Sequence, residues 1–263
     1  MSNFFNTDRF SKLFIKHSQE HYKSYLMSAA VLMGVMVMGG SFLIYLINTS
    51  LDPMFQMLLY VWMLLLGGTI FTSTIFAEYG NNKKVIAKLS LPASHFEKYL
   101  VAWLYSFIIV FLVITASFYM VMLFLLNIKH FSQQQPEMFD LMQRPGGLQF
   151  PLLFLVLALY AFMHSLAFYG AIFFEKLHFI KTAFLFFIVL AISMYGNKFL
   201  LDLMLHKDTR PALLLTNVAF WENRHIVILN LKDNKEVYAL GLYLIVALLF
   251  WTAAYYRLKE KQA

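Results

Sequence analysis

The chain contains no cysteine among its 263 residues. This absence excludes disulfide bonds, thiolate metal sites and cysteine nucleophiles. The sequence also lacks a phosphate-binding loop of the form Gly-x-x-x-x-Gly-Lys-Ser/Thr. If the protein uses the energy of ATP, another polypeptide must therefore bind the nucleotide.

Charged residues are scarce, at 13% of the chain, whereas apolar residues make up 60% and the mean hydropathy is +0.65. In a typical soluble domain about a quarter of the residues are charged. The charges here are clustered between long apolar runs instead of scattered as on a soluble surface. The composition therefore predicts an integral membrane protein. Basic residues flanking membrane spans explain the net charge of +7 better than nucleic-acid binding does.

Six apolar segments are long enough to cross a bilayer core of about 30 Å, which takes about 20 helical residues. They are 25–47, 54–77, 100–126, 151–174, 180–201 and 237–256. We expect an all-α fold with one six-helix transmembrane domain over 25–256 and a tail over 257–263. The fifth segment is interrupted by Tyr195-Gly-Asn-Lys198, which leaves a broken or re-entrant helix as an alternative. The first is too long for a signal peptide, so we expect it to remain as a span.

The distribution of the 21 lysines and arginines predicts the orientation. Most of them fall on the side that holds the N-terminus, the 78–99 loop, the 175–179 turn and the C-terminus. Because basic flanks stay in the cytoplasm, both termini are predicted to be cytoplasmic. An even number of spans agrees with this arrangement.

Residues 1–24 are expected to form an amphipathic helix. Its stripe, at steps of three and four, consists of Phe10, Leu13, Phe14, His17, His21 and Tyr25. This pattern favours a helix lying in the membrane interface before the first span, and the alternative is a helix packed against a partner. Because the zinc motif His-Glu-x-x-His is absent, His17 and His21 are interpreted as interface histidines rather than metal ligands.

The 78–99 loop between the second and third spans is predicted to dock a partner. The turn residues Gly80-Asn-Asn82 lie near its start. A pattern with helical spacing follows them, and Pro92 ends that pattern. Ser94 followed by Glu97 is a capping box that begins the third helix before its apolar core. We expect the docking surface to lie on a short cytoplasmic helix and at its start. Its residues are Glu78, Lys83, Lys84, Val85, Ile86, Lys88 and Leu89.

Two longer segments fall on the predicted exterior side. Segment 127–150 contains turn residues around Pro136 and over Arg144-Pro-Gly-Gly147, which indicates a loop. Segment 202–236 is mixed in character, and Ile226–Leu231 alternates in the manner of a β-strand. We expect this second segment to form a small exterior cap or to re-enter the bilayer in part.

Few functional groups lie inside the spans. His164 is the one ionisable residue well inside a span, and such residues are functional candidates by default. Neighbouring helical positions point about 100° apart, so His164 and Ser165 do not form a catalytic dyad with each other. A Ser/His pair between helices, as in an intramembrane hydrolase, is one alternative. The other is a His164 that hydrogen-bonds across helices or lines a wet cavity.

The second span is rich in small and hydroxyl residues around Gly67 and Gly68. Small residues let helices approach closely, and hydroxyls can bond across helices. Helix packing is the default interpretation of this pattern. The functional alternative is a translocation path or a dimer face, for which the candidates in the spans are Thr69, Thr72, Ser73 and His164.

These parts together resemble the membrane subunit of a type-2 ABC transporter, an exporter permease. The motif that carries the resemblance consists of Phe76-Ala-Glu78, Gly80, Leu89, Pro92, Ser94 and Lys98. The resemblance implies that residues 82–91 form a coupling helix with Glu78 at its start. It also implies a homodimer or pseudo-dimer, docked to separate ATPase subunits, in a bacterial cytoplasmic (inner) membrane. Tyr79 stands where the family often has an arginine.

The resulting functional hypothesis is a non-enzymatic permease subunit of an ATP-driven exporter. No cofactor is expected in this chain, because ATP would bind to the partner subunit, and no nucleic acid is expected. The alternatives are an ATP-independent transporter or channel, and a membrane scaffold within a larger assembly. An enzyme is the class that the sequence supports least.

Overall fold

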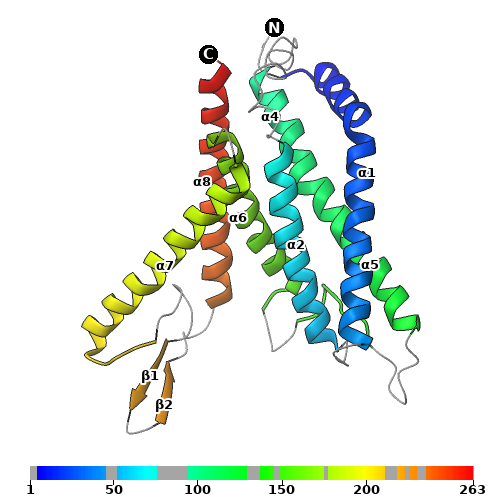
Figure 1. Ribbon diagram of the computed structural model, residues 1–263. Coiled ribbons are helices and arrows are strands. Elements are labelled where there is room, and N and C mark those ends of the chain that lie inside the picture. Colours follow the sequence, from blue (N-terminus) through cyan, green and yellow to red (C-terminus); the bar gives the residue numbers. More distant parts are fainter. Residues whose placement is uncertain are drawn as a thin grey trace.

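The computed structural model describes residues 5–45, 52–75, 94–128, 137–144, 149–174, 177–210, 218–222, 225–229 and 235–262. Within these ranges the chain forms long helices and one β-hairpin (Figure 1). The helices are α1 (Thr7–Tyr45), α2 (Pro53–Ile75), α4 (His95–Trp103), η2 (Leu104–Ile109), α5 (Val110–Ile128), α6 (Leu152–Phe173), α7 (His178–Leu205) and α8 (Lys235–Gln262). The strands are β1 (Val218–Glu222) and β2 (His225–Leu229). α4, η2 and α5 follow one another without a break and form the third long helix.

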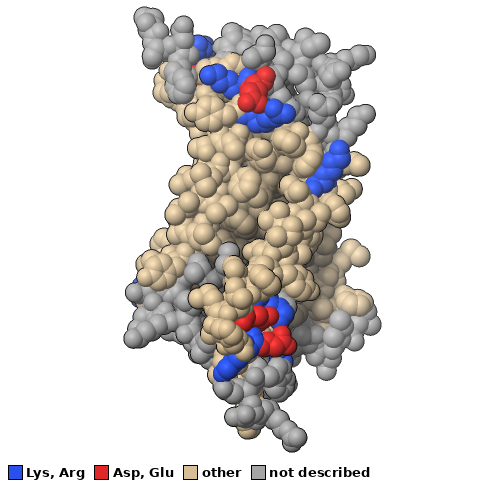
Figure 2. Space-filling model, turned by 90° about the vertical axis from the view of Figure 1, so that its left-hand side faces the viewer, with Lys and Arg blue, Asp and Glu red and all other residues tan. Residues whose placement is uncertain are grey.

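Six of these helices are long and apolar enough to cross a membrane, with α4, η2 and α5 counted as one. Their most apolar stretches have mean hydropathies from 1.8 to 2.7. On the face shown in Figure 2, the charged side chains of the described residues gather toward the two ends, and a band without them lies between. The predicted all-α, multi-pass membrane architecture is confirmed at this level. α1 begins and α8 ends at the same end of the molecule (Figure 1), as an even number of spans requires.

The first helix is longer than the predicted span. α1 runs without a break from Thr7 to Tyr45, so most of the predicted segment 1–24 and the described part of the first span belong to one helix. No proline or glycine interrupts the sequence between Thr7 and Met33, and nothing there ends a helix. The apolar stripe at the start of α1 packs on this chain's own core, through Phe10, Leu13, Phe14 and Tyr25. A position in the lipid interface stays a prediction.

The fifth span is also continuous. α7 passes through Tyr195, Gly196 and Asn197 as regular helix and ends at Leu205. A glycine in a helix costs only about 1 kcal/mol relative to alanine, and Lys198 forms an ion pair one turn further on with Asp202, at 2.9 Å. The broken or re-entrant alternative is therefore wrong.

The exterior segment after α7 contains the predicted strand. β2 covers most of the alternating stretch and pairs antiparallel with β1, from Val218 opposite Leu229 to Glu222 opposite His225. The end of α7 is fastened to this hairpin, because Thr209 donates through its N–H to Asp202 at 2.7 Å and bridges to Phe220. The described part of segment 202–236 therefore contains a two-stranded hairpin attached to the end of α7, and its position as an exterior cap stays a prediction.

The buried residues form two clusters, one toward each end of the helices. The first joins α1, α2, α5 and α6 with the loop segment 137–144, and the second joins α2, α4, η2, α6 and α8. α6 contributes to both clusters and packs against α2, α7 and α8. It is the central helix of the described structure.

α2 and α6 approach closely at Gly68. A Cβ atom added there would lie 2.5 Å from Cε2 of Tyr160. The tyrosine ring cannot move aside easily, because it stacks on Phe107 with centroids 5.1 Å apart and its hydroxyl donates to the carbonyl of Ser106 at 2.9 Å. The packing interpretation of the glycine-rich part of the second span is thus supported at Gly68.

We predict that Gly68→Ala lowers the free energy of unfolding by about 1–3 kcal/mol, the usual cost of overpacking a tight contact. Gly34→Ala is the matched control, since no atom lies within 4 Å of the added Cβ, and it should be neutral or slightly stabilising. Both are measured by denaturant unfolding in detergent micelles. Equal stability of the two variants would contradict the close contact.

Candidate functional site

The start of α4 carries a fully buried carboxylate. Ser94 caps the helix by accepting a hydrogen bond from the N–H of Glu97 at 3.2 Å, and Glu97 Oε2 accepts from the N–H of Ser94 at 2.8 Å. The predicted capping box is therefore confirmed. The side chain of Glu97 is 0% exposed, which a simple cap does not require.

The other oxygen of Glu97 binds the start of α1. Glu97 Oε1 accepts from the backbone N–H of Asn6 at 2.8 Å and from Nη2 of Arg9 at 3.2 Å. Asn6 in turn caps α1, because its Oδ1 accepts from the N–H of Asp8 at 2.9 Å. One carboxylate thus lies at the N-termini of two helices, where the helix dipoles favour negative charge. We call Asn6, Arg9, Ser94 and Glu97 the helix-start junction.

A π-helical turn follows α4 within the third long helix. At the end of η2 the N–H of Val110 is shared between the carbonyl of Tyr105, five residues earlier, and that of Phe107, instead of bonding four residues back. Such widened turns are rare and often occur at functional sites. Here the turn places Ser106 in the interior, with its backbone carbonyl accepting the hydroxyl proton of Tyr160 from α6.

Ser106 and His164 form a buried contact between the third helix and α6. The Nε2 atom of His164 lies 2.8 Å from Oγ of Ser106, and Nε1–H of Trp251 on α8 donates to Nδ1 of His164 at 3.1 Å. Because an indole nitrogen can only donate, Nδ1 carries a lone pair and the proton of the neutral ring is on Nε2. His164 therefore donates to Ser106, and three helices meet at one imidazole.

This arrangement is not that of a nucleophile and its general base. A base would have to accept the Ser106 proton at Nε2, but that nitrogen is the donor. The Ser106 hydroxyl itself donates to the carbonyl of Ala102 at 2.8 Å. Both side chains are fully buried. Of the two alternatives for His164, the geometry supports the hydrogen bond across helices.

Aromatic rings enclose the polar contact. Phe168 stacks on the ring of His164 at 5.3 Å, and Phe107 meets it edge to face at 5.1 Å. Trp251 is fixed at its backbone as well, because its carbonyl accepts the hydroxyl proton of Tyr99 at 2.9 Å. We call Tyr99, Ser106, Tyr160, His164 and Trp251 the central polar network.

The hydroxyl residues of the second span bond to their own helix. Thr69 donates to Leu65, Thr72 to Gly68 and Ser73 to Ile70, all at backbone carbonyls. In these three hydrogen bonds the hydroxyls do not bond across helices, contrary to what the sequence leads us to expect. Together with His164 they are buried within one copy of the chain. Their role in a translocation path or a dimer face stays a prediction.

The predicted docking residues lie outside the described part of the chain. Glu78, Lys83, Lys84, Val85, Ile86, Lys88 and Leu89 all fall between residues 75 and 94. Their role as a docking surface also stays a prediction. The described chain resumes at Ser94, in the helix-start junction itself.

His17 and His21 lie side by side on α1, with ring centroids 4.6 Å apart. They belong to an aromatic group, in which His17 Nε2 lies 2.6 Å from the hydroxyl of Tyr25 and its ring lies 4.4 Å from that of Tyr105. Among the described residues, no group of three or more His, Asp or Glu side chains is placed to hold a metal ion.

Several site residues were not singled out by the sequence reasoning. Arg9, Ser106, Tyr160 and Trp251 carry no local pattern, because their partners are far away along the chain. Gln56 is a further case: it is fully buried at the start of α2, and its side-chain amide donates to the carbonyl of Glu137 at 3.0 Å. A lone polar residue within an apolar span was the available signal for both Ser106 and Gln56.

No protein-family model, curated protein or solved structure matches this chain. The class that the fold defines is therefore an all-α, multi-pass integral membrane protein. Anything narrower depends on the residues themselves.

We predict that Trp251→Phe lowers the free energy of unfolding by about 1–3 kcal/mol, because it leaves Nδ1 of His164 buried without a donor. Trp62→Phe is the matched control, since Trp62 is 57% exposed on α2. Denaturant titration in micelles measures both variants. If Trp251→Phe and Trp62→Phe lower the free energy of unfolding equally, the hydrogen bond to His164 does not stabilise the fold.

We predict that Arg9→Met lowers the free energy of unfolding by about 1–2 kcal/mol, because it removes a charged donor from buried Glu97 while the guanidinium itself is partly exposed. Lys16→Met removes an exposed cation that pairs with Glu20 on the same helix and should cost about 0.5 kcal/mol or less. The same titration compares them. A larger loss for Lys16→Met would contradict the junction.

Proposed function

We propose that this protein is the membrane-spanning permease subunit of an ATP-driven exporter in a bacterial cytoplasmic membrane. A separate ABC ATPase subunit would supply the energy and dock on the 78–99 loop. Two copies of the chain, or this chain and a related one, would form the complete transporter. The nucleotide would bind to the partner, because this chain has no phosphate-binding loop.

The observation that carries the proposal is the position of Glu97. This residue lies near the end of the 78–99 loop, after the predicted docking residues, and its carboxylate bonds to the starts of both α4 and α1. A displacement of the loop would therefore move two long helices together. A buried carboxylate is costly unless it is fully paired. A loop that only connects two spans would not need such a residue at the start of the following helix.

A second set of contacts continues from α4 into the membrane. Ser106 lies about two and a half turns after Glu97 along the same long helix, and the central polar network joins it to α6 and α8. A π-helical turn is a point where a helix can change its hydrogen-bond pattern. In the proposed mechanism, motion at the helix-start junction reaches α6 and α8 through this network.

The proposal is tested by co-purification and by transport. Replacing Lys83, Lys84 and Lys88 with glutamate should reduce recovery of an ABC ATPase subunit co-expressed with this chain. It should also reduce ATP-dependent export in proteoliposomes, because charge reversal disrupts a docking surface. The control reverses three exposed lysines on the same predicted side, Lys12, Lys23 and Lys259. This control should keep both the partner and the transport.

Other outcomes identify the alternatives. Substrate flux in liposomes that contain this chain alone would show an ATP-independent transporter or channel. A stable partner complex without flux would show a scaffold. If the ATPase does not associate with the native chain, or if the loop variant transports as well as the control, the proposal is wrong.

A further inference from the structure

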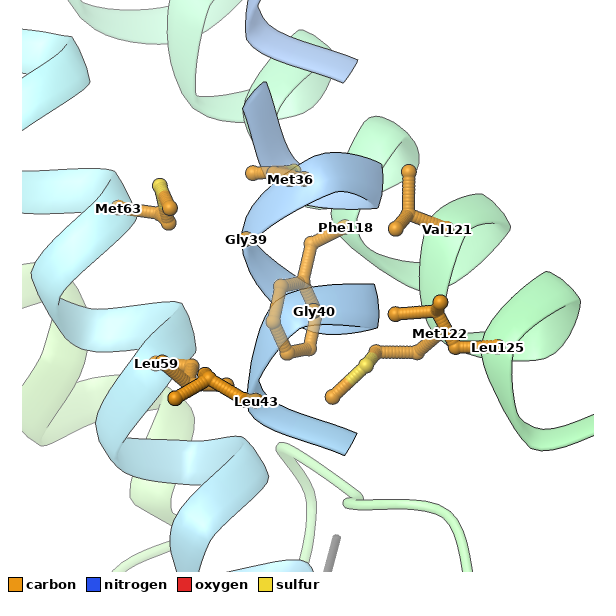
Figure 3. A pocket seen from close by; sticks show the side chains of 10 residues that line it. All are labelled: Met36, Gly39, Gly40, Leu43, Leu59, Met63, Phe118, Val121, Met122 and Leu125. Atoms are coloured by element: carbon orange, nitrogen blue, oxygen red, sulfur yellow. The ribbon is translucent and has the colours of Figure 1, made fainter. Parts of the chain in front are cut away.

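A cavity of about 80 Å³ lies between α1, α2 and α5, outside the central polar network (Figure 3). Ten residues line it, and none of them has a side chain that is charged or forms a hydrogen bond. Met36, Met63 and Met122 approach it from the three helices in turn. Thioether side chains are flexible and adapt to irregular apolar ligands.

Two neighbouring glycines on α1 shape the cavity in different ways. At Gly40 an added Cβ would lie 2.3 Å from Cδ1 of Leu125, so this glycine lets α1 approach α5 closely. At Gly39 no atom lies within 4 Å of an added Cβ, and the residue is exposed. The cavity is therefore open at Gly39, on the outer surface of α1.

The opening faces hydrocarbon. Met38 and Phe42 on the adjoining surface of α1 are exposed at 76% and 52%, and this part of α1 belongs to a candidate membrane span. The cavity lies in the last turns of α1 and α5 and toward the start of α2. It is therefore in the half of the membrane away from the helix-start junction.

Water is a poor occupant for this space. A buried water needs two to four polar partners, and the lining residues offer no polar side chain. The volume is several times the roughly 10–15 Å³ that one water requires. If it were left empty, the lining atoms would lose their dispersion contacts on one side.

We propose that this cavity is a binding site for a phospholipid acyl chain, which enters from the adjoining leaflet beside Gly39. The methylene groups of the chain fill the space between the three methionines. The inference does not rest on the proposed exporter function, because it concerns this chain and the bilayer alone.

The test uses the full chain in phosphatidylethanolamine and phosphatidylglycerol vesicles that contain a phospholipid with a diazirine on one acyl chain. After illumination, label assigned to single residues by fragment-ion mass spectrometry should be found at Met63 and Met122. Gly39→Leu fills the opening and should reduce this labelling several-fold. Gly34→Leu is the matched control, because it adds the same side chain at an exposed position of α1 with no atom within 4 Å, and it should leave labelling unchanged.

Leu59→Trp fills the same space from α2 and should repeat the loss if Gly39→Leu folds poorly. The inference is wrong if both filling variants label like the control. It is also wrong if Met63 and Met122 are labelled no more than Met54 and Met120, which are exposed at 66% and 59%. A Gly39→Cys chain contains no other cysteine, so an interchain disulfide at that position would show that a second copy covers the opening instead.

Discussion

The hydrogen bonds of His164 are the constraint on which the middle of this structure depends. Neither water nor lipid can satisfy a fully buried imidazole in a membrane helix, so the protein must supply both partners. Ser106 and Trp251 do so from two other helices. Because the indole can only donate, the bonds also determine the tautomer, and with it the chemistry that His164 can perform.

The same principle operates at the helix-start junction with a charge instead of a neutral ring. Glu97 is buried at the ends of α1 and α4, where free N–H groups and helix dipoles stabilise a carboxylate. Arg9 adds a charged donor from the partly exposed side. Glu97 of the junction and Ser106 of the central polar network lie on one continuous helix, which begins beside the predicted docking loop and contacts α6 and α8.

The remaining contacts between helices are apolar and depend on shape. Hydrophobic burial gives little drive for helices to associate in lipid, so close packing must provide the affinity. Gly68 against Tyr160 and Gly40 against Leu125 show how small residues permit it. Where the packing is incomplete, an apolar cavity remains between α1, α2 and α5.

The sequence by itself determined the class of the protein and the position of its six spans, because length and hydropathy act locally. It also determined the capping box of Ser94 and Glu97, in which both partners lie within one turn. Only the tertiary structure decided that Arg9 reaches Glu97, that His164 bonds to Ser106 and Trp251, and that α7 continues past Gly196. Those contacts join residues up to 88 positions apart or depend on the surroundings of a helix, and no local pattern encodes them.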